Sequence, residues 1–385
     1  MGRVFIFGAG SSRAVCSTAP LNNELLPGVL QLRGALVTKR VKQLNQFIRK
    51  FYSLPEGTLP RLEDMLSQLD LAISEGRPLS PEYTLQKLRE LRENLILAVA
   101  ELLRRRLGQT SAHPAVDTSA FFRTLVSDDS IVSLNYDIIL DNALLRYRRS
   151  SKVKGINYGI GIRYAFDIDG EILCGRHRYP EALIDPPIYK PHGSLNWLYC
   201  PVCGKLDVTR TDRFTGGKAV PFLLDDQRPK CWDCFGPYEA LIITPTLFKA
   251  YNNSLLLDVW REIETRLSVA DEVLFIGYSL PDADIHLRCM LSRAIFRNRS
   301  RALVNGPTIR VIGLEREHTE PQDYYRRTAS DTHRRYMSLF GEVDYDPTGF
   351  EGYVGRGCRT FHQNESLTNQ RETGGLPGTL KSEDE

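Results

Sequence analysis

The chain has 385 residues, 42% of them hydrophobic and 25% charged, with 50 lysines plus arginines against 47 aspartates plus glutamates. This composition is ordinary for a globular protein and excludes the collagenous, disordered and membrane-spanning classes. The formal net charge of +3 is too small to indicate nucleic-acid binding. No apolar run reaches the roughly 18–20 residues of a membrane helix, and the sequence shows no signal peptide. We therefore expect a cytoplasmic protein that binds neither membrane nor nucleic acid directly.

The first predicted element is a buried strand over residues 3–7, which ends in a tight turn. The residues of this turn are Gly8, Ala9, Gly10 and Ser11. In a parallel sheet, such a turn brings backbone N–H groups and a helix N-terminus to the carboxyl edge, where glycines allow a diphosphate to approach closely. A tight turn that needs only small residues is the alternative, because Arg13 stands where GxGxxG has its third glycine.

Residues 21–108 show helical spacing of apolar residues. The pattern then changes to a strand over 130–134, followed by Asn135 and Asp137 and by a further helix. Asn135 is therefore expected at the carboxyl end of a parallel strand, where it is either a helix N-cap or a ligand-binding group. Residues 150–185 are predicted to form a small β excursion.

His192 lies in the segment Lys190-Pro-His-Gly-Ser194. The proline before it fixes the chain path, and the glycine after it lets the backbone open toward a ligand. A single histidine is more often a packed or surface residue, so this assignment depends on its context.

Two CxxC pairs follow, separated by 27 residues. The four cysteines are Cys200, Cys203, Cys231 and Cys234. Each pair can present two thiolates to one tetrahedral ion, so the spacing predicts a zinc ribbon. Four protein ligands close the coordination sphere, which indicates a structural zinc; unmetallated cysteines and a redox CxxC are the alternatives.

The remaining pattern alternates strand and helix. Gly277 and Ser279 follow a strand and could contact a ribose or phosphate, while Asp282 and Asp284 are expected as N-cap and first-turn acids of the next helix. The predicted elements are strands at 240–244, 272–280 and 308–314, the last strand of the chain, and helices at 255–267 and 284–297.

The alternation predicts an α/β fold with a mostly parallel, Rossmann-like sheet covered by helices on both faces, plus a helical module and a small four-cysteine zinc ribbon. We expect a discontinuous sheet domain. The boundaries are 1–20 and 110–340 for the sheet domain, 21–109 for the helical module, 198–236 for the zinc ribbon and 341–385 for a partly disordered C-terminal extension, with its tail at 373–385.

Taken in order over about residues 3–315, these motifs resemble the sirtuin superfamily, and most closely the sirtuin-like domains of bacterial antiphage defence proteins. The resemblance implies NAD+ as substrate and a structural zinc. By position, it implies diphosphate contacts by Gly8, Ala9, Gly10 and Ser11 and ribose contacts by Gly277 and Ser279. It also implies catalytic roles for Asn135, Asp137 and His192.

The chain departs from the protein deacylases of that family. It has Ala19-Pro-Leu-Asn-Asn-Glu24 after the first turn, and Thr244-Pro-Thr-Leu-Phe-Lys249 in place of the Phe-Gly-Glu segment of the acyl-lysine tunnel. We therefore expect an NAD+ hydrolase that cleaves the nicotinamide–ribose bond. An NAD-dependent deacylase and a non-catalytic nucleotide sensor or scaffold are the alternatives.

Free NAD+ hydrolysis would deplete the cell, so the proposed activity implies restraint. The resemblance implies an antiphage effector that is held inactive until infection. The chain carries no P-loop GxxxxGK[ST] of its own. We therefore expect a homo-oligomer and a separately encoded regulator such as a HerA-type ATPase.

Overall fold

The computed structural model describes most of the chain. The described residues are 2–35, 37–55, 57–108, 116–147, 154–161, 163–168, 171–178, 182–209, 230–231, 233–242, 254–301, 306–314 and 323–359. The predicted disordered tail at 373–385 and the segment Thr244 to Lys249 lie outside these residues.

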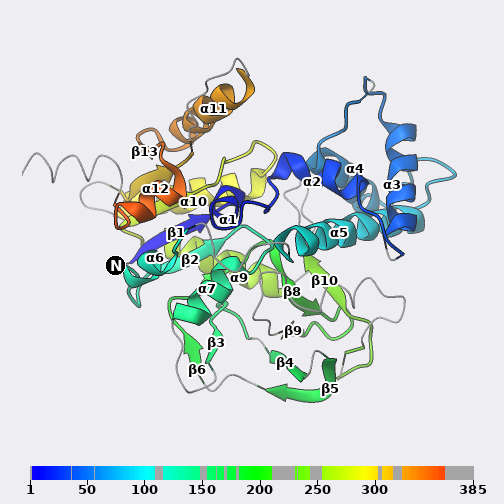
Figure 1. Cartoon of the computed structure of the whole chain (residues 1–385), viewed down its shortest axis with the longest axis horizontal. Helices are drawn as coiled ribbons and strands as arrows, with labels where there is room; N and C mark the ends of the chain where they lie inside the picture. The colour runs from blue at the N-terminus through cyan, green and yellow to red at the C-terminus, as the bar shows by residue number, and fades with distance from the viewer. Residues whose placement is uncertain are drawn as a thin grey trace, which may run out of the picture.

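The largest sheet of the described residues is parallel and has six strands, some of which are labelled in Figure 1 on the side of the N-terminus. In chain order its strands are β1 (Arg3–Phe7), β2 (Ser130–Ser133), β7 (Ile188–Tyr189), β11 (Glu272–Ile276), β12 (Thr308–Ile312) and β13 (Asp344–Asp346). Numbered one to six in that order, they lie side by side as 3-2-1-4-5-6. This is the order of Rossmann-type sheets, in which ligands bind at the carboxyl ends where the order reverses.

Both faces of the sheet are buried, as the sequence predicts. Along β1, Val4 and Ile6 belong to one hydrophobic core, and Phe5 and Phe7 belong to the other. This alternation follows from the period of two in a strand, and two apolar faces require helices on both sides.

Helices from distant parts of the chain cover the two faces. The core that contains Phe5 and Phe7 receives side chains from α1 (Ala9–Val15), α6 (Ser119–Arg123), α7 (Ile139–Tyr147) and α12 (Gly349–Gly355). The core that contains Val4 and Ile6 receives them from α9 (Ser254–Leu267), α10 (Ile285–Arg301) and α11 (Asp323–Phe340). The predicted fold class is confirmed.

The predicted helical segment forms four helices beside the sheet (Figure 1). They are α2 (Asn22–Leu30), α3 (Thr38–Phe51), α4 (Leu62–Ser74) and α5 (Leu85–Gly108). The apolar residues of α5 that recur at helical spacing, among them Leu88, Leu91 and Leu95, are buried in the core that contains Phe5 and Phe7. Amphipathic spacing therefore identified this segment correctly.

A second sheet has the order β10-β8-β9-β4-β5, and a separate pair is formed by β3 and β6. The strands are β3 (Lys154–Ile156), β4 (Arg163–Ile168), β5 (Glu171–Arg178), β6 (Ala182–Ile184), β8 (Gly193–Tyr199), β9 (Leu206–Thr209) and β10 (Glu239–Ile242). The predicted excursion at 150–185 supplies four of these strands, β3 to β6. The strand expected at 240–244 is β10, which pairs with β8 and not with the parallel sheet.

The expected last strand is not the last. The strand predicted at 308–314 is β12, and β13 pairs with it in parallel, beyond residue 340 where we placed a C-terminal extension. The sequence Asp344-Tyr-Asp346 has no apolar run, so its pattern did not reveal an edge strand. Arg310 of β12 pairs with Asp344, and Phe350 of α12 packs against Phe7, so the sheet unit extends past residue 340.

Candidate functional site

The four segments singled out for chemistry follow four adjacent strands. Gly8 follows β1, Asn135 comes soon after β2, His192 comes soon after β7 and Gly277 follows β11. Because parallel strands end at the same edge, all four segments meet at the carboxyl edge of the sheet. The reversal of strand order lies between β1 and β11, within this set.

The two glycine turns pack directly on each other. A Cβ on Gly8 would lie 2.6 Å from the Tyr278 Cα, and a Cβ on Gly277 would lie 2.3 Å from the Ser11 nitrogen. The Gly10 N–H donates to the Gly277 carbonyl at 2.9 Å, while the Gly8 and Ser11 N–H groups donate to the carbonyls of Ile276 and Gly8. The glycines are therefore needed first for this close backbone approach. Three of the N–H groups expected at a diphosphate already have partners within the protein.

Asn135 and Asp137 are joined through Ser12 on α1. The Asn135 Nδ2 donates to the Ser12 Oγ at 2.8 Å and to the Gly8 carbonyl at 2.9 Å. The Ser12 hydroxyl in turn donates to the Asp137 carboxylate at 2.7 Å. The Ile139 N–H donates to the same carboxylate, so Asp137, and not Asn135, caps α7. Ser12 is a member of the site that the sequence did not single out.

A buried charge cluster lies behind this loop. Lys190 is fully buried, and its ammonium donates to the carbonyl of Asp137 and to the Asp141 carboxylate at 3.3 Å. Asp141 also accepts from the Tyr158 hydroxyl at 2.6 Å. The sequence reading passed over Lys190 and Asp141, because neither type of residue stands out next to a proline or within a helix.

The His192 ring is hydrogen-bonded at Nδ1 and lies near a carboxylate at Nε2. Its Nδ1 lies 3.1 Å from the Leu134 carbonyl, which fixes the proton on Nδ1 because a carbonyl can only accept. Its Nε2 lies 3.7 Å from the Asp284 carboxylate, and the ring lies 6.0 Å from that of Trp260. The imidazole and Asn135 are therefore brought to one loop, since Leu134 immediately precedes Asn135.

Asp284 has a second use besides the helix start we assigned to it. It does precede α10, and its carbonyl accepts from the Arg288 N–H. Its carboxylate, however, is buried, faces His192 and accepts from the Tyr278 hydroxyl at 3.1 Å. Asp282 is exposed and pairs with Arg288, as expected of a surface acid. Only burial in the folded chain distinguishes these two aspartates.

Burial dominates the ionisation of this region. It raises the pKa of Asp137, and the Lys190 charge and the Ser12 hydrogen bond oppose that rise. Burial together with the Asp284 charge raises the pKa of Tyr136 well above its usual value, so this phenol stays neutral.

Gly193, expected to open toward a ligand, has φ +81°, and a Cβ there would lie 1.8 Å from the Leu241 carbonyl oxygen. The lack of a side chain at Gly193 therefore allows β10 to pack against it.

Ser279 stands apart from the hydrogen-bonded cluster. It is exposed on the loop after β11, and its carbonyl accepts from the Arg335 guanidinium at 3.0 Å. The Tyr278 carbonyl likewise accepts from the Tyr336 hydroxyl at 3.0 Å, so α11 holds this loop from outside.

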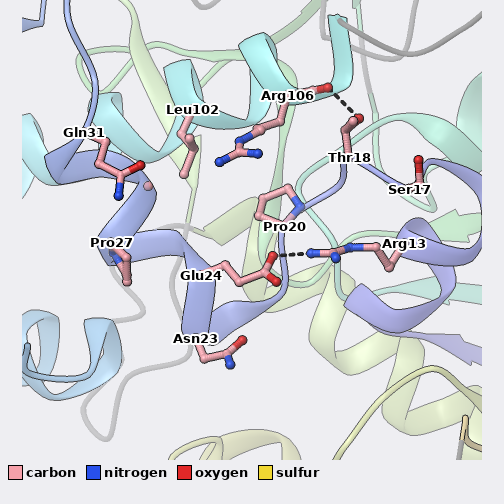
Figure 2. Close-up of a pocket in the computed structure, with 11 residues that line it drawn as sticks. Arg13, Ser17, Thr18, Pro20, Asn23, Glu24, Pro27, Gln31, Leu102 and Arg106 are labelled. Carbon is pink, nitrogen blue, oxygen red and sulfur yellow. Dashed lines mark hydrogen bonds and ion pairs between the residues drawn. The ribbon is translucent and has the colours of Figure 1, made fainter. Parts of the chain in front are cut away.

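A cavity of about 390 Å³ lies between α1, α2 and α5. Figure 2 shows Arg13 and Glu24 meeting across it and Thr18 bonded to the Arg106 carbonyl. None of the predicted catalytic residues lines it. The predicted catalytic residues therefore lie outside this cavity, although α1 contributes residues to both regions.

The four cysteines converge as predicted. Their sulfur atoms all lie within 4.8 Å of one another, with Cys200 to Cys234 at 3.3 Å and Cys203 to Cys231 at 3.6 Å. Tetrahedral Zn–S bonds of about 2.3 Å place sulfurs about 3.8 Å apart, so the cluster fits zinc.

Two matching turns build this cluster. The Gly204 N–H donates to the Cys200 carbonyl at 2.9 Å, and the Phe235 N–H donates to the Cys231 carbonyl at 2.8 Å. Gly204 and Phe235 both have positive φ, +71° and +60°. Burial acts to raise the pKa of the Cys231 thiol, but backbone N–H groups of Asp233 and Cys234 bring it down to about 7. Cys231 could therefore supply a thiolate to a metal near neutral pH, whereas burial raises the pKa of the Cys200 and Cys203 thiols.

Comparisons with known proteins give distant structural similarity only. The sequence matches no protein-family model and no curated protein. Among solved structures, one described as a Sir2–p53 peptide–NAD+ complex is similar with a TM-score of 0.33 and 15% identity, covering 88% of this chain and 93% of that one. Another, on the mechanism and regulation of Sir2 enzymes, has a TM-score of 0.33 and 10% identity over 87% and 93%. Similarity at this level does not place the chain in a family.

None of the helices in the described ranges has the length and apolar character needed to cross a membrane.

Proposed function

We propose that this chain is an NAD+ hydrolase that cleaves the bond between nicotinamide and ribose. The observation that carries the proposal is the meeting of a carboxamide, an imidazole and a carboxylate beside a glycine turn, at the carboxyl edge where Rossmann-type sheets bind nucleotides. The order of the sequence motifs, which resembles that of sirtuins, points to the same chemistry.

Asn135 is suited to position the nucleophile. Its Nδ2 is fixed by Gly8 and Ser12, which orients the amide. No hydrogen bond from the described residues reaches its Oδ1, so this oxygen is left to accept from water or a ribose hydroxyl. Holding the attacking group in one geometry removes much of the entropic barrier of the reaction.

His192 is suited to act as general base. With the proton on Nδ1, the lone pair is on Nε2, which can take a proton from the attacking group. The imidazolium that forms then lies beside the Asp284 carboxylate, 3.7 Å away, which stabilises it. Asp137, two residues after Asn135 in the same loop, is assigned to orient the nicotinamide or the ribose hydroxyl.

NAD+ would bind at the glycine turn that follows β1. Gly8, Ala9, Gly10 and Ser11 are assigned to the diphosphate and Gly277 with Ser279 to a ribose. Because the Gly10 N–H donates to the Gly277 carbonyl, we propose that NAD+ binding breaks this bond between the two glycine turns and frees the Gly10 donor. The four cysteines would hold a zinc ion whose role is to fold the two knuckles, because no coordination site is left for a reactant.

We further propose the sequence-based domain division, with the sheet unit extended through α12. The same proposal includes an effector role in antiphage defence, a homo-oligomer and a separately encoded regulator such as a HerA-type ATPase. These follow because an unrestrained NAD+ hydrolase would deplete the NAD+ of its own cell.

Measuring the size of the purified chain, alone and with the product of the neighbouring gene, tests this assembly. A monomer with full constitutive activity would contradict it.

The deciding experiment is a time course of NAD+ and its products with purified protein, alone and with the neighbouring gene product. We expect nicotinamide and ADP-ribose or a cyclic product to accumulate without any peptide. His192→Ala should lower the rate about 10²–10⁴-fold, the range that a general base contributes. Asn135→Ala should lower it comparably.

His333→Ala is the matched control, because this histidine stacks on Tyr345 at 4.6 Å between ring centres and lies outside the cluster. It should hydrolyse NAD+ like the wild type. NAD+ consumption that requires an acylated peptide would indicate a deacylase instead. NAD+ binding without turnover would indicate a sensor.

A further inference from the structure

The fully buried Lys190 has no role in the reaction proposed above. Burying an ammonium ion costs several kcal/mol, of which its partners return only part. An apolar side chain of similar size at this place would commonly be as stable or more so. The Lys190 charge is therefore expected to have a role other than stability. The contacts of the ammonium group indicate that role.

Lys190 belongs to a segment that holds the carbonyls of the catalytic loop. The His192 Nδ1 binds the carbonyl of Leu134, the Leu195 N–H binds that of Tyr136 at 2.8 Å, and the Lys190 ammonium binds that of Asp137. Residues 190–195 thus fix the backbone on both sides of Asn135. Lys190 is the charged member of this set, and charge-assisted hydrogen bonds are roughly twice as strong as neutral ones.

We propose that Lys190 is a positioning residue that holds the loop of Asn135 and Asp137 in the geometry required for NAD+ cleavage. The inference rests on the proposed function and adds a residue to it. Asp141 on α7 anchors the ammonium from the far side, and Tyr158 anchors Asp141. Without the ammonium, the Asp137 carbonyl loses its donor, and the Asn135 amide loses the loop geometry on which its bonds to Ser12 and Gly8 depend.

The test removes the charge without leaving an unpaired one. Lys190→Met alone would strand the Asp141 carboxylate in the interior, which costs several kcal/mol. The paired variant Lys190→Met with Asp141→Asn keeps an acceptor for the Tyr158 hydroxyl and removes both charges. We expect kcat for NAD+ to fall about 10–100-fold, comparable to misplacing a catalytic group by about 1 Å. KM should change less than threefold.

A matched control lies at the other end of the sheet. Arg310 on β12 also sits between two carboxylates, Glu272 of β11 and Asp344 of β13. Arg310→Met with Glu272→Gln and Asp344→Asn removes all three charges near the opposite end of the strand order from β7, so that no carboxylate is left unpaired. It should lower the melting temperature and leave kcat unchanged, which separates loss of stability from loss of positioning.

A double-mutant cycle distinguishes positioning from a general structural effect. If Lys190 acts through Asn135, adding Asn135→Ala to the paired variant lowers kcat no further than Asn135→Ala alone. Additive losses, or wild-type kcat in the paired variant, would overturn the role of Lys190 while the proposed function stands. A wild-type protein without NAD+ turnover under both assay conditions would overturn the proposed function, and this role with it.

Discussion

Two clusters of reactive side chains in this molecule are completed in different ways. At the carboxyl edge of the parallel sheet, the Asn135, Ser12, Asp137 and Lys190 groups bond to one another and to the backbone. In the cysteine cluster, four sulfur atoms lie within 4.8 Å of one another, and backbone N–H groups bond to Cys231. Hydrogen bonds between unlike groups hold the first cluster together, whereas the second gathers four like ligand atoms around the place of a cation. A perturbation of one should therefore leave the other intact.

Loss of zinc should produce the largest effect. Structural zinc sites contribute apparent binding energies of about 10–16 kcal/mol, which become folding energy of the segments they tie together. We expect Cys231→Ser to reduce bound zinc from one per chain to none, as measured by elemental analysis. Hydrogen exchange should then show loss of protection around Cys200 and Cys231, with β1 and β2 still protected.

Cys289→Ser is the control for this experiment, because Cys289 is an exposed cysteine on α10 outside the cluster. It should retain the full zinc content. Protection lost equally in β1 after zinc removal would show that the two clusters are not independent.

A substitution at Gly277 should break the sheet edge and spare the zinc. Gly277 and Gly76 have nearly the same φ, +63° and +67°, but a Cβ on Gly277 meets backbone at 2.3 Å, and one on Gly76 meets nothing within 4 Å. Gly76→Ala should therefore cost about 1 kcal/mol of unfolding free energy, from conformation alone. Gly277→Ala should cost about 3 kcal/mol or more, from conformation and overlap together.

Urea unfolding measures both glycine variants, and elemental analysis should find zinc unchanged in each. Equal costs would mean that the turn at Ser11 accommodates a Cβ at Gly277 without strain. That result would contradict the close packing on which the geometry of the edge depends.

The smallest predicted effect is a pH dependence at Asp137. Burial raises its folded-state pKa above the unfolded value of about 3.9, so the folded chain binds this proton more tightly. The resulting stabilisation is fully present below the unfolded pKa and is lost as pH rises through the folded pKa. The cysteine cluster responds in the opposite direction, because acid protonates thiolates and releases zinc.

The variant Asp137→Asn lacks the carboxyl group that binds this proton. The unfolding free energy of the wild type, minus that of Asp137→Asn, should therefore increase as pH falls from about 7 toward about 4. Urea titrations of both proteins, in matched zinc, measure this difference. A difference that decreases over the same interval would contradict the raised pKa.

The sequence predicted most of the fold because apolar strands and helices have clear periods. The strand at 3–7 matches β1 in both bounds, and the cysteine spacing predicted a cluster that the structure brings together. It did not predict β13, whose alternating acids resemble a loop. It also did not reveal that Asp284 faces His192, because a residue before a helix has the same pattern whether its carboxylate caps the helix or turns inward.

The glycines illustrate a different limit. A run such as Gly8-Ala-Gly10 indicates that something approaches the backbone, but not what approaches it. Here the approaching group is the turn at Gly277, and at Gly193 it is the Leu241 carbonyl. Which N–H groups remain for a ligand is decided by tertiary packing, and no local pattern carries that information.

The position of β1 also has a consequence for biosynthesis. β1 leaves the ribosome before the other strands of its sheet, but it lies in the middle of that sheet. Its second edge stays uncovered until β11, more than 260 residues later, has been synthesised. Phe350, which packs on Phe7, follows later still. A growing chain therefore cannot complete this core before Phe350 has been synthesised, and such long-range contacts favour slow folding. Under the proposed NAD+ hydrolysis, a nascent chain that ends before β11 is expected to be inactive.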